Sequence, residues 1–216
     1  MCSAFERLMR EKLKEFSIDD DGQLRGYCES QAEIDVLLTQ LKCVGYSYSV
    51  RRSTQQPKSS DASRSCPKFF FRLKSGSVDI RFFRYPFSVE NAGHRECILG
   101  PKYYKEKKGV PVPDHLADHM NPRKRLCVMD TKKSGCPATF SVKCIRVYPG
   151  YSIESEGAHP NIKKRVLESL RQALVSPNQP TSFLRFHVVA SPVGSHTHTQ
   201  YRKCQSYCRN IPYASK

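Results

Sequence analysis

The sequence lacks several features that would place it in a common class of protein. It has no run of 18 apolar residues, which argues against a membrane span. Its first 16 residues, MCSAFERLMREKLKEF, are charged throughout and contain no apolar h-region, so we expect no secretory signal. A nucleophile elbow, a phosphate-cradling glycine-rich loop and paired carboxylates in a suitable context are also absent. We therefore expect neither an enzyme nor a membrane protein.

Acidic residues are scarce relative to basic ones. The chain has 36 Lys and Arg against 20 Asp and Glu, a formal charge of +16. Such an excess favours a polyanionic partner, either nucleic acid or an acidic membrane surface. Because the sequence shows no lipidation signal and no basic amphipathic helix with a broad apolar face, we favour nucleic acid.

Cysteine, in contrast, is abundant. There are 10 cysteines in 216 residues and no secretory signal, so free thiols or metal ligands are better interpretations than a disulfide scaffold. With 38% hydrophobic residues, the composition is that of a polar globular chain with room for one modest core and some extensions.

Three segments have the pattern of amphipathic helices. Ser3 and Glu6 have capping-box spacing before an apolar stripe that predicts a helix over residues 3–16. Ser30 and Glu33 repeat that spacing and predict a second helix over residues 30–42. A third helix is predicted over residues 161–175.

Other segments alternate as strands do. The strand candidates are residues 46–52, 68–73, 78–83, 136–149 and 181–192. In residues 136–149 the apolar set runs from Ala138 to Cys144 at every second position and then shifts to Ile145 and Val147. This shift predicts a β-bulge near Cys144.

A candidate metal site begins with His196 and His198 in the stretch VGSHTHTQYRK. On a β-strand, residues i and i+2 point to the same side, so this spacing would aim two imidazoles at one point. Structural zinc takes four tetrahedral N or S ligands. Cys136, at the start of a strand, supplies a third ligand, and either Cys97 or Cys127 supplies the fourth.

The motifs ECILGPKYYKEK and TKKSGCPATFSVK, followed by His-x-His, resemble those of a known zinc-domain superfamily. The layout over residues 28–200 is similar to the DNA-binding domains of the WRKY, FLYWCH and Mutator-like (far-red-impaired-response-like) superfamily, and closest to the calcium-responsive transcription factor group. The resemblance implies an α+β fold, in which a small antiparallel sheet is pinned by one Cys-Cys-His-His zinc and flanked by helices. It implies Cys97, Cys136, His196 and His198 as ligands, whereas a WRKY-like arrangement would use Cys127 instead of Cys97.

The implied organisation has three parts. Residues 1–27 form an N-terminal helix and linker, residues 28–200 form the zinc-dependent domain, and residues 201–216 form a basic tail. The long segments 109–125 and 161–175 are an inserted loop and an inserted helix. We see no transposase core after residue 200 and therefore expect no catalytic half of a Mutator element in this sequence.

The function implied is sequence-specific binding of double-stranded DNA, in transcription regulation in the nucleus, with one structural zinc. Arginines on a strand in the major groove can contact guanine, and lysines suit phosphates. The candidate DNA-binding residues are Arg51, Arg52, Lys102, Lys105, Lys107, Lys108, Arg123, Lys124 and Arg125. The alternative is a protein-interaction module or a transposon-derived remnant without DNA binding.

Overall fold

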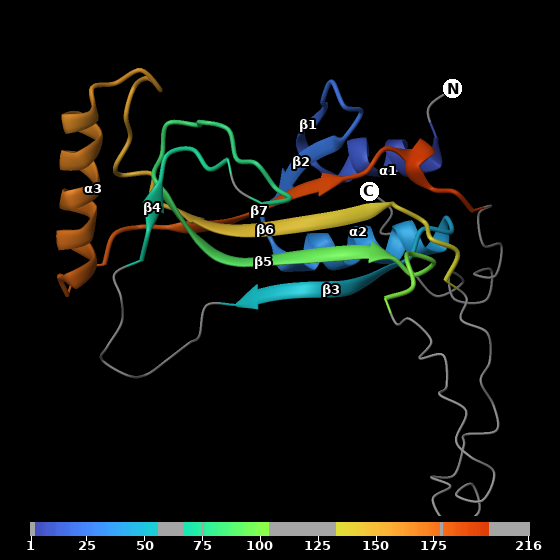
Figure 1. Cartoon of the computed structure of the whole chain (residues 1–216). Helices are drawn as coiled ribbons and strands as arrows, with labels where there is room; N and C mark the ends of the chain where they lie inside the picture. The colour runs from blue at the N-terminus through green and yellow to red at the C-terminus, as the bar shows by residue number, and fades with distance from the viewer. Residues whose placement is uncertain (1–2, 56–66, 75, 104–132, 178, 199–216) are drawn as a thin grey trace, which may run out of the picture.

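A computed structural model describes residues 3–55, 67–74, 76–103, 133–177 and 179–198. Over these residues the chain forms α-helices and one antiparallel sheet of seven strands, which confirms the expected α+β class (Figure 1). The strands follow the order β1-β2-β7-β6-β5-β3, and β4 pairs with β5 outside this path. The bounds are β1 Lys14–Ile18, β2 Leu24–Cys28, β3 Tyr48–Gln55, β4 Phe69–Phe70, β5 Phe87–Cys97, β6 Thr139–Val147 and β7 Phe183–Ala190.

Helices α1 (Ala4–Lys12) and α2 (Gln31–Cys43) pack on one face of the sheet, which we call the helix face. Both begin as their capping boxes predict, because Ser3 Oγ accepts from Glu6 N at 3.1 Å and Ser30 Oγ accepts from Glu33 N at 3.2 Å. Figure 1 shows the central strands in front of these two helices. Their common core contains residues from both helices and from the sheet, among them Phe5, Met9, Ile34, Leu37, Phe140, Val142, Phe186 and Val188.

The first predicted helix is too long. It ends at Lys12, and residues 14–18 form β1, which pairs with β2 through a turn at Asp19–Gly22. Residues 14–28, where we expected the end of a helix and a linker, are thus a β-hairpin whose second strand pairs with β7. Phe16 packs against the same core from its position in the strand, so its apolar character fitted either structure.

The opposite side of the sheet, the open face, is only partly covered. Residues 69–87 fold over the part of it formed by β5 and β6, where Ile80, Phe87, Ile145 and Val147 are buried together. The two candidate strands of this segment contribute only β4 and a single bridge between Leu73 and Ile80. Helix α3 (Pro160–Val175) lies at one end, where Leu170 packs with Phe69 and Tyr148 (Figure 1).

The predicted bulge near Cys144 lies on the neighbouring strand. β6 pairs with β7 in unbroken register from Phe140 to Val147, whereas the β5–β6 register shifts between Val89 and Asn91, opposite Cys144 and Ile145. The apolar pattern of β6 changes phase because the covering changes. α1 and α2 bury Phe140, Val142 and Cys144 on the helix face, and residues 69–87 bury Ile145 and Val147 on the open face.

Candidate metal centre

Cys97 is the last residue of β5 and is buried. Its N–H donates to Ala138 O at 2.9 Å, and its carbonyl accepts from Gly100 N at 2.7 Å. A Cβ atom on Gly100 would lie 2.8 Å from that carbonyl oxygen, so only glycine allows this tight turn. The turn ends the strand and holds the Cys97 thiol at the end of the sheet.

Cys136 reaches the same place from the loop before β6. Ser134 N and Cys136 N both donate to Leu99 O, at 2.9 and 3.1 Å. Between them Gly135 has a φ of +81°, in the left-handed region that favours glycine. Cys97, Leu99, Cys136 and Ala138 form a small buried cluster, so the two thiols lie away from water.

The two histidines follow the end of β7 at Ala190 and a short 3₁₀ turn, Val193–Ser195. They therefore do not lie on a strand, and our expectation that strand alternation brings them together was wrong. The turn does so instead, and places His196 Nδ1 3.1 Å from His198 Nε2. In Figure 1 the ends of β5 and β7 and the beginnings of β3 and β6 meet at the right of the view, where this site lies.

The four side chains have the geometry of a site for one metal ion. Their ligand atoms all lie within 4.8 Å of one another. Cys97 Sγ is 3.2 Å from His198 Nε2, and Cys136 Sγ is 3.6 Å from His196 Nδ1. A tetrahedral ion with bonds of about 2.0 Å to N and about 2.3 Å to S requires N–N and N–S separations of about 3.3 to 3.6 Å. The three contacts, at 3.1, 3.2 and 3.6 Å, lie close to these separations, and a bound ion would need to draw the remaining ligand atoms, up to 4.8 Å apart, closer together.

Burial shifts the pKa of two of the four candidate ligands. Burial raises the pKa of Cys97 to about 11, and the neighbouring Cys136 adds to that rise. Burial, with a smaller contribution from His198, lowers the pKa of His196 to about 4. The neutral His196 imidazole can bind a metal directly, whereas Cys97 must first lose its proton, a loss that the charge of a bound metal would favour.

A tyrosine that the sequence analysis did not assign to the site orients one ligand. Tyr48, the first residue of β3, has its hydroxyl 3.0 Å from His196 Nε2. If Nδ1 binds the metal, Nε2 carries the proton and donates it to Tyr48, as ligand histidines usually do toward an outer partner. Burial keeps Tyr48 protonated by raising its pKa.

Of the two alternatives for the first cysteine, Cys97 is the one that lies with the other three ligands. Cys127 falls outside the described residues. So do six of the candidate DNA-binding residues, namely Lys105, Lys107, Lys108, Arg123, Lys124 and Arg125, together with the inserted loop 109–125 and the basic tail.

The remaining candidate DNA-binding residues are exposed and lie near the metal centre. Arg51 and Arg52 are on β3, which is the edge strand of the sheet, and Lys102 follows the turn after Cys97. The β3–β5 register shifts between Val50 and Arg52, so that Arg51 is the extra residue of a β-bulge.

This bulge turns both arginines to the same side. Arg52 pairs with His94, and Arg51 Nε lies 3.1 Å from Glu96 Oε2. His94 and Glu96 are two residues apart on β5 and therefore share a face, the open face. Two residues that the sequence analysis missed hold Arg51 there, since Tyr103 donates to Glu96 at 2.6 Å and its ring lies 3.6 Å from the guanidinium carbon.

Comparison with known proteins gives one family. The family model described as "Amyotrophic lateral sclerosis 2 chromosomal region candidate gene 8" (ALS2CR8) matches residues 61–214. This range contains three strands of the sheet's central part, helix α3 and all four candidate metal ligands. No curated protein and no solved structure matches the chain.

Proposed function

We propose that this chain, which belongs to the ALS2CR8 family, is a sequence-specific binder of double-stranded DNA whose sheet is held together by one structural zinc ion. A role in transcription regulation in the nucleus, within the WRKY, FLYWCH and Mutator-like group of domains, is part of the proposal. We propose no enzymatic activity, because four protein ligands leave a metal no open position for water or substrate.

Zinc is the metal that the donor set fits best. Two cysteine sulfurs and two histidine nitrogens in a tetrahedral arrangement are typical of structural zinc, whereas magnesium and calcium take oxygen ligands. The ligands come from the end of β5, the start of β6 and the segment after β7. One ion would tie these three segments together, next to the edge strand that carries Arg51 and Arg52.

The observation that carries the DNA-binding proposal is the pair of arginines on one face of edge strand β3. A two-stranded ribbon fits the major groove, and arginine binds guanine O6 and N7 with two hydrogen bonds. Arg51 is held in place by Glu96 and Tyr103, which lowers the entropy lost on binding a base. Arg52 forms no ion pair or hydrogen bond with any described residue, so its donors are available.

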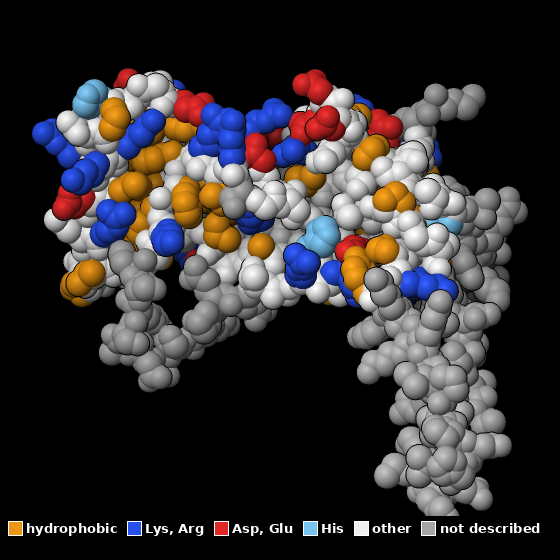
Figure 2. All heavy atoms as spheres, viewed as in Figure 1, with side chains coloured by type: hydrophobic (Ala, Val, Ile, Leu, Met, Phe, Trp, Pro, Cys, Tyr) orange, Lys and Arg blue, Asp and Glu red, His pale blue; other side chains and the backbone are white. Residues whose placement is uncertain are grey.

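Charge supports the same interpretation. The whole chain carries a formal +16, and Figure 2 shows Lys and Arg side chains spread over the visible surface. Lys102, exposed beside the metal centre, is placed to contact a phosphate. Along the described part of the chain, no helix has the length and apolar character needed to cross a membrane.

Selection from random DNA duplexes with the zinc-loaded full chain tests the proposal. We expect enrichment of a G-containing site, with an affinity that falls steeply as salt rises. Arg52→Gln should weaken binding to that site by about tenfold, the effect of losing one base contact. Arg165→Gln, an equal charge change on the exposed side of α3, is the matched control and should have a much smaller effect.

A second candidate, a protein-interaction module, has one observation in its favour. Val50, Ile98 and Tyr103, at or near the same sheet edge, are 58%, 46% and 52% exposed. Two results together would reject sequence-specific DNA binding and favour this candidate. No DNA sequence would be enriched, and Arg52→Gln and Arg165→Gln would reduce the affinity for duplex DNA equally.

A further inference from the structure

A pocket of about 380 Å³ opens on the open face, at the end of the sheet order farther from β3. Its floor consists of outward-facing residues of two paired strands, with Tyr27 of β2 directly opposite His187 of β7. One wall is β1 and the other is the segment 78–83. The volume falls in the range of small-molecule sites, about 300 to 1,000 Å³, and is too small for a duplex.

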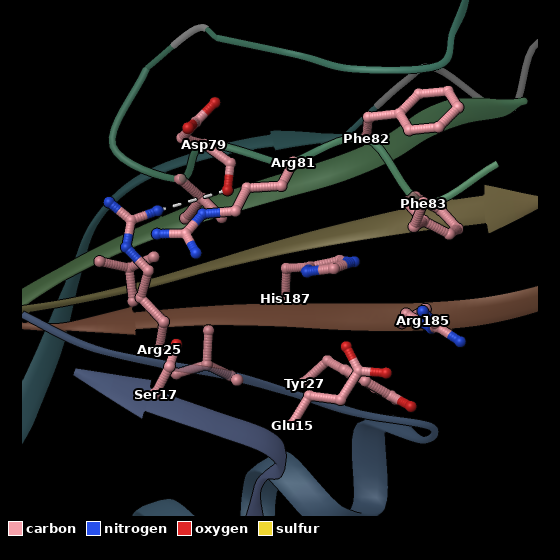
Figure 3. A pocket seen from close by; sticks show the side chains of 14 residues that line it. Glu15, Ser17, Arg25, Tyr27, Asp79, Arg81, Phe82, Phe83, Arg185 and His187 are labelled. Carbon is pink, nitrogen blue, oxygen red and sulfur yellow. Dashed lines mark hydrogen bonds between the residues drawn. The ribbon is translucent and has the colours of Figure 1, made fainter. Parts of the chain in front are cut away.

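The pocket differs from the buried apolar cluster of Ile80, Phe87, Ile145 and Val147 on the same face, because several charged side chains line it. Figure 3 shows Arg25 and Arg81 together at one end, His187 in the middle and Arg185 at the other end. Arg25 and Arg81 share one acidic partner, Asp19, which offsets one of their two positive charges. The floor of the pocket is thus lined by charged and aromatic side chains that the fold does not need for a core.

Arg185 is different from the other two arginines. Its guanidinium carbon lies 4.0 Å from the centre of the Tyr27 ring and 5.2 Å from that of Phe83, so two aromatic rings fix its orientation. It forms no ion pair or hydrogen bond with the described residues, and its Nε is buried without an acceptor. A fixed, unpaired guanidinium is a receptor for an oxyanion, which it can bind with two parallel hydrogen bonds.

The pKa of His187 is also affected by positive charge in this pocket. Burial, Arg185 and Lys143 together lower its pKa to about 4. A neutral imidazole in the centre of the pocket offers an aromatic face, and the rings of Tyr27 and Phe83 lie 5.9 and 6.3 Å from it. At the Arg25–Arg81 end, the main-chain carbonyl of Asp79 accepts from Arg25 Nη1 at 3.4 Å (Figure 3).

We infer that this pocket binds a small molecule that joins an aromatic ring to an oxyanion, as a mononucleotide does. The oxyanion pairs with Arg185, and the ring packs against His187 and Phe83. The inference is independent of duplex binding, because the residues involved lie on β2, β7 and the segment 78–83 and not on β3.

Calorimetric titration of the zinc-loaded full chain tests the inference with four probes. These are 5′-AMP, which has both groups, adenosine and inorganic phosphate, which have one each, and benzoate, which has a carboxylate in place of the phosphate. We expect 5′-AMP or benzoate to bind at least about tenfold more tightly than phosphate and adenosine. Preference between 5′-AMP and benzoate identifies a phosphate-bearing or a carboxylate-bearing ligand. Equal, weak affinity for all four probes would overturn the inference.

Three variants separate the pocket from general charge. Arg185→Gln should weaken the tighter-binding probe by about tenfold or more, and Arg165→Gln, on α3, should leave its affinity unchanged. Phe83→Leu keeps every charge and removes one ring, so it should weaken 5′-AMP or benzoate more than it weakens phosphate. Equal losses in Arg185→Gln and Arg165→Gln would show nonspecific attraction and would also overturn the inference. Unchanged thermal unfolding of each variant confirms that the sheet is intact.

Discussion

The two faces of the sheet differ in what their side chains do. On the helix face, Phe140, Val142, Phe186 and Val188 pack against α1 and α2 in the largest core of the chain. On the open face, Arg25 of β2, His94 of β5, and Arg185 and His187 of β7 are half-buried. Alternate residues of one strand point to opposite faces of the sheet. Residues that stabilise the core are therefore adjacent in sequence to residues with a proposed binding role. The metal centre lies at the end of the sheet, beyond the residues that form the two faces.

The largest expected effect on stability comes from the loss of a metal ligand. Cys136→Ser should lose the bound metal and destabilise the domain by several kcal/mol, because metal binding and folding are coupled. Metal content by mass spectrometry and thermal unfolding measure this. Cys144→Ser changes another buried thiol, one in the helix-face core, and should keep one metal per chain. Equal metal loss in both variants would contradict the assigned ligand set.

Two adjacent residues of β6 allow the contributions of the two faces to stability to be compared directly. Phe140 is fully buried on the helix face, and Phe140→Ala should cost about 3 to 5 kcal/mol of unfolding free energy. Ser141 points to the open face, where its hydroxyl lies 2.8 Å from His94 Nδ1, and Ser141→Ala should cost about 1 kcal/mol. Urea denaturation measures both. A Ser141→Ala cost as large as that of Phe140→Ala would mean that the open face also carries much of the stability.

His187, on the open face, should make the free energy of unfolding depend on pH. The pKa of His187 is about 4 in the folded chain and near 6.5 when unfolded. Above pH 6.5 the residue is neutral in both states. Below it, only the unfolded chain takes up a proton, so stability falls as pH drops from 6.5 toward 4, by roughly 3 kcal/mol in total.

Denaturation of metal-loaded wild type and His187→Gln across this pH range measures the contribution, as the difference between the two curves. The difference removes any loss of metal in acid, which both proteins share. Parallel curves would show that His187 is protonated equally in the folded and unfolded chains, contrary to its low pKa.

The smallest expected effect is on Arg51. Tyr103→Phe removes only the hydroxyl that donates to Glu96 and keeps the ring against the guanidinium. Because the Tyr103 side chain is half exposed, the free energy of unfolding should change by less than about 0.5 kcal/mol. Affinity for the selected DNA site should fall about two- to fivefold, through looser positioning of Arg51. Gel-shift titration measures this fall, and a loss equal to that of Arg52→Gln would give Tyr103 a direct role in DNA contact.

Local signals in the sequence predicted the elements that are held by local contacts. The capping boxes at Ser3 and Ser30 begin helices, and α3 occupies nearly the range that its apolar stripe predicts. Strand β7 lies within the predicted strand 181–192. Most of β5 was missed, because Asn91, Gly93, His94 and Arg95 show no apolar alternation. It is a strand because β3 and β6 supply hydrogen bonds on both sides.

The sequence by itself determined which residue types are available: two cysteines, a His-x-His pair, two adjacent arginines and a large positive charge. It also determined the glycines at 100 and 135 that permit the turns of the metal centre. Only the tertiary structure decided that Cys97 lies with Cys136 and the histidines, since the ligands are separated by up to 101 positions. The same holds for the shared face of Arg51 and Arg52 and for the pocket around Arg185. These depend on a bulge and on strand pairing, which are fixed by contacts between segments far apart in the chain.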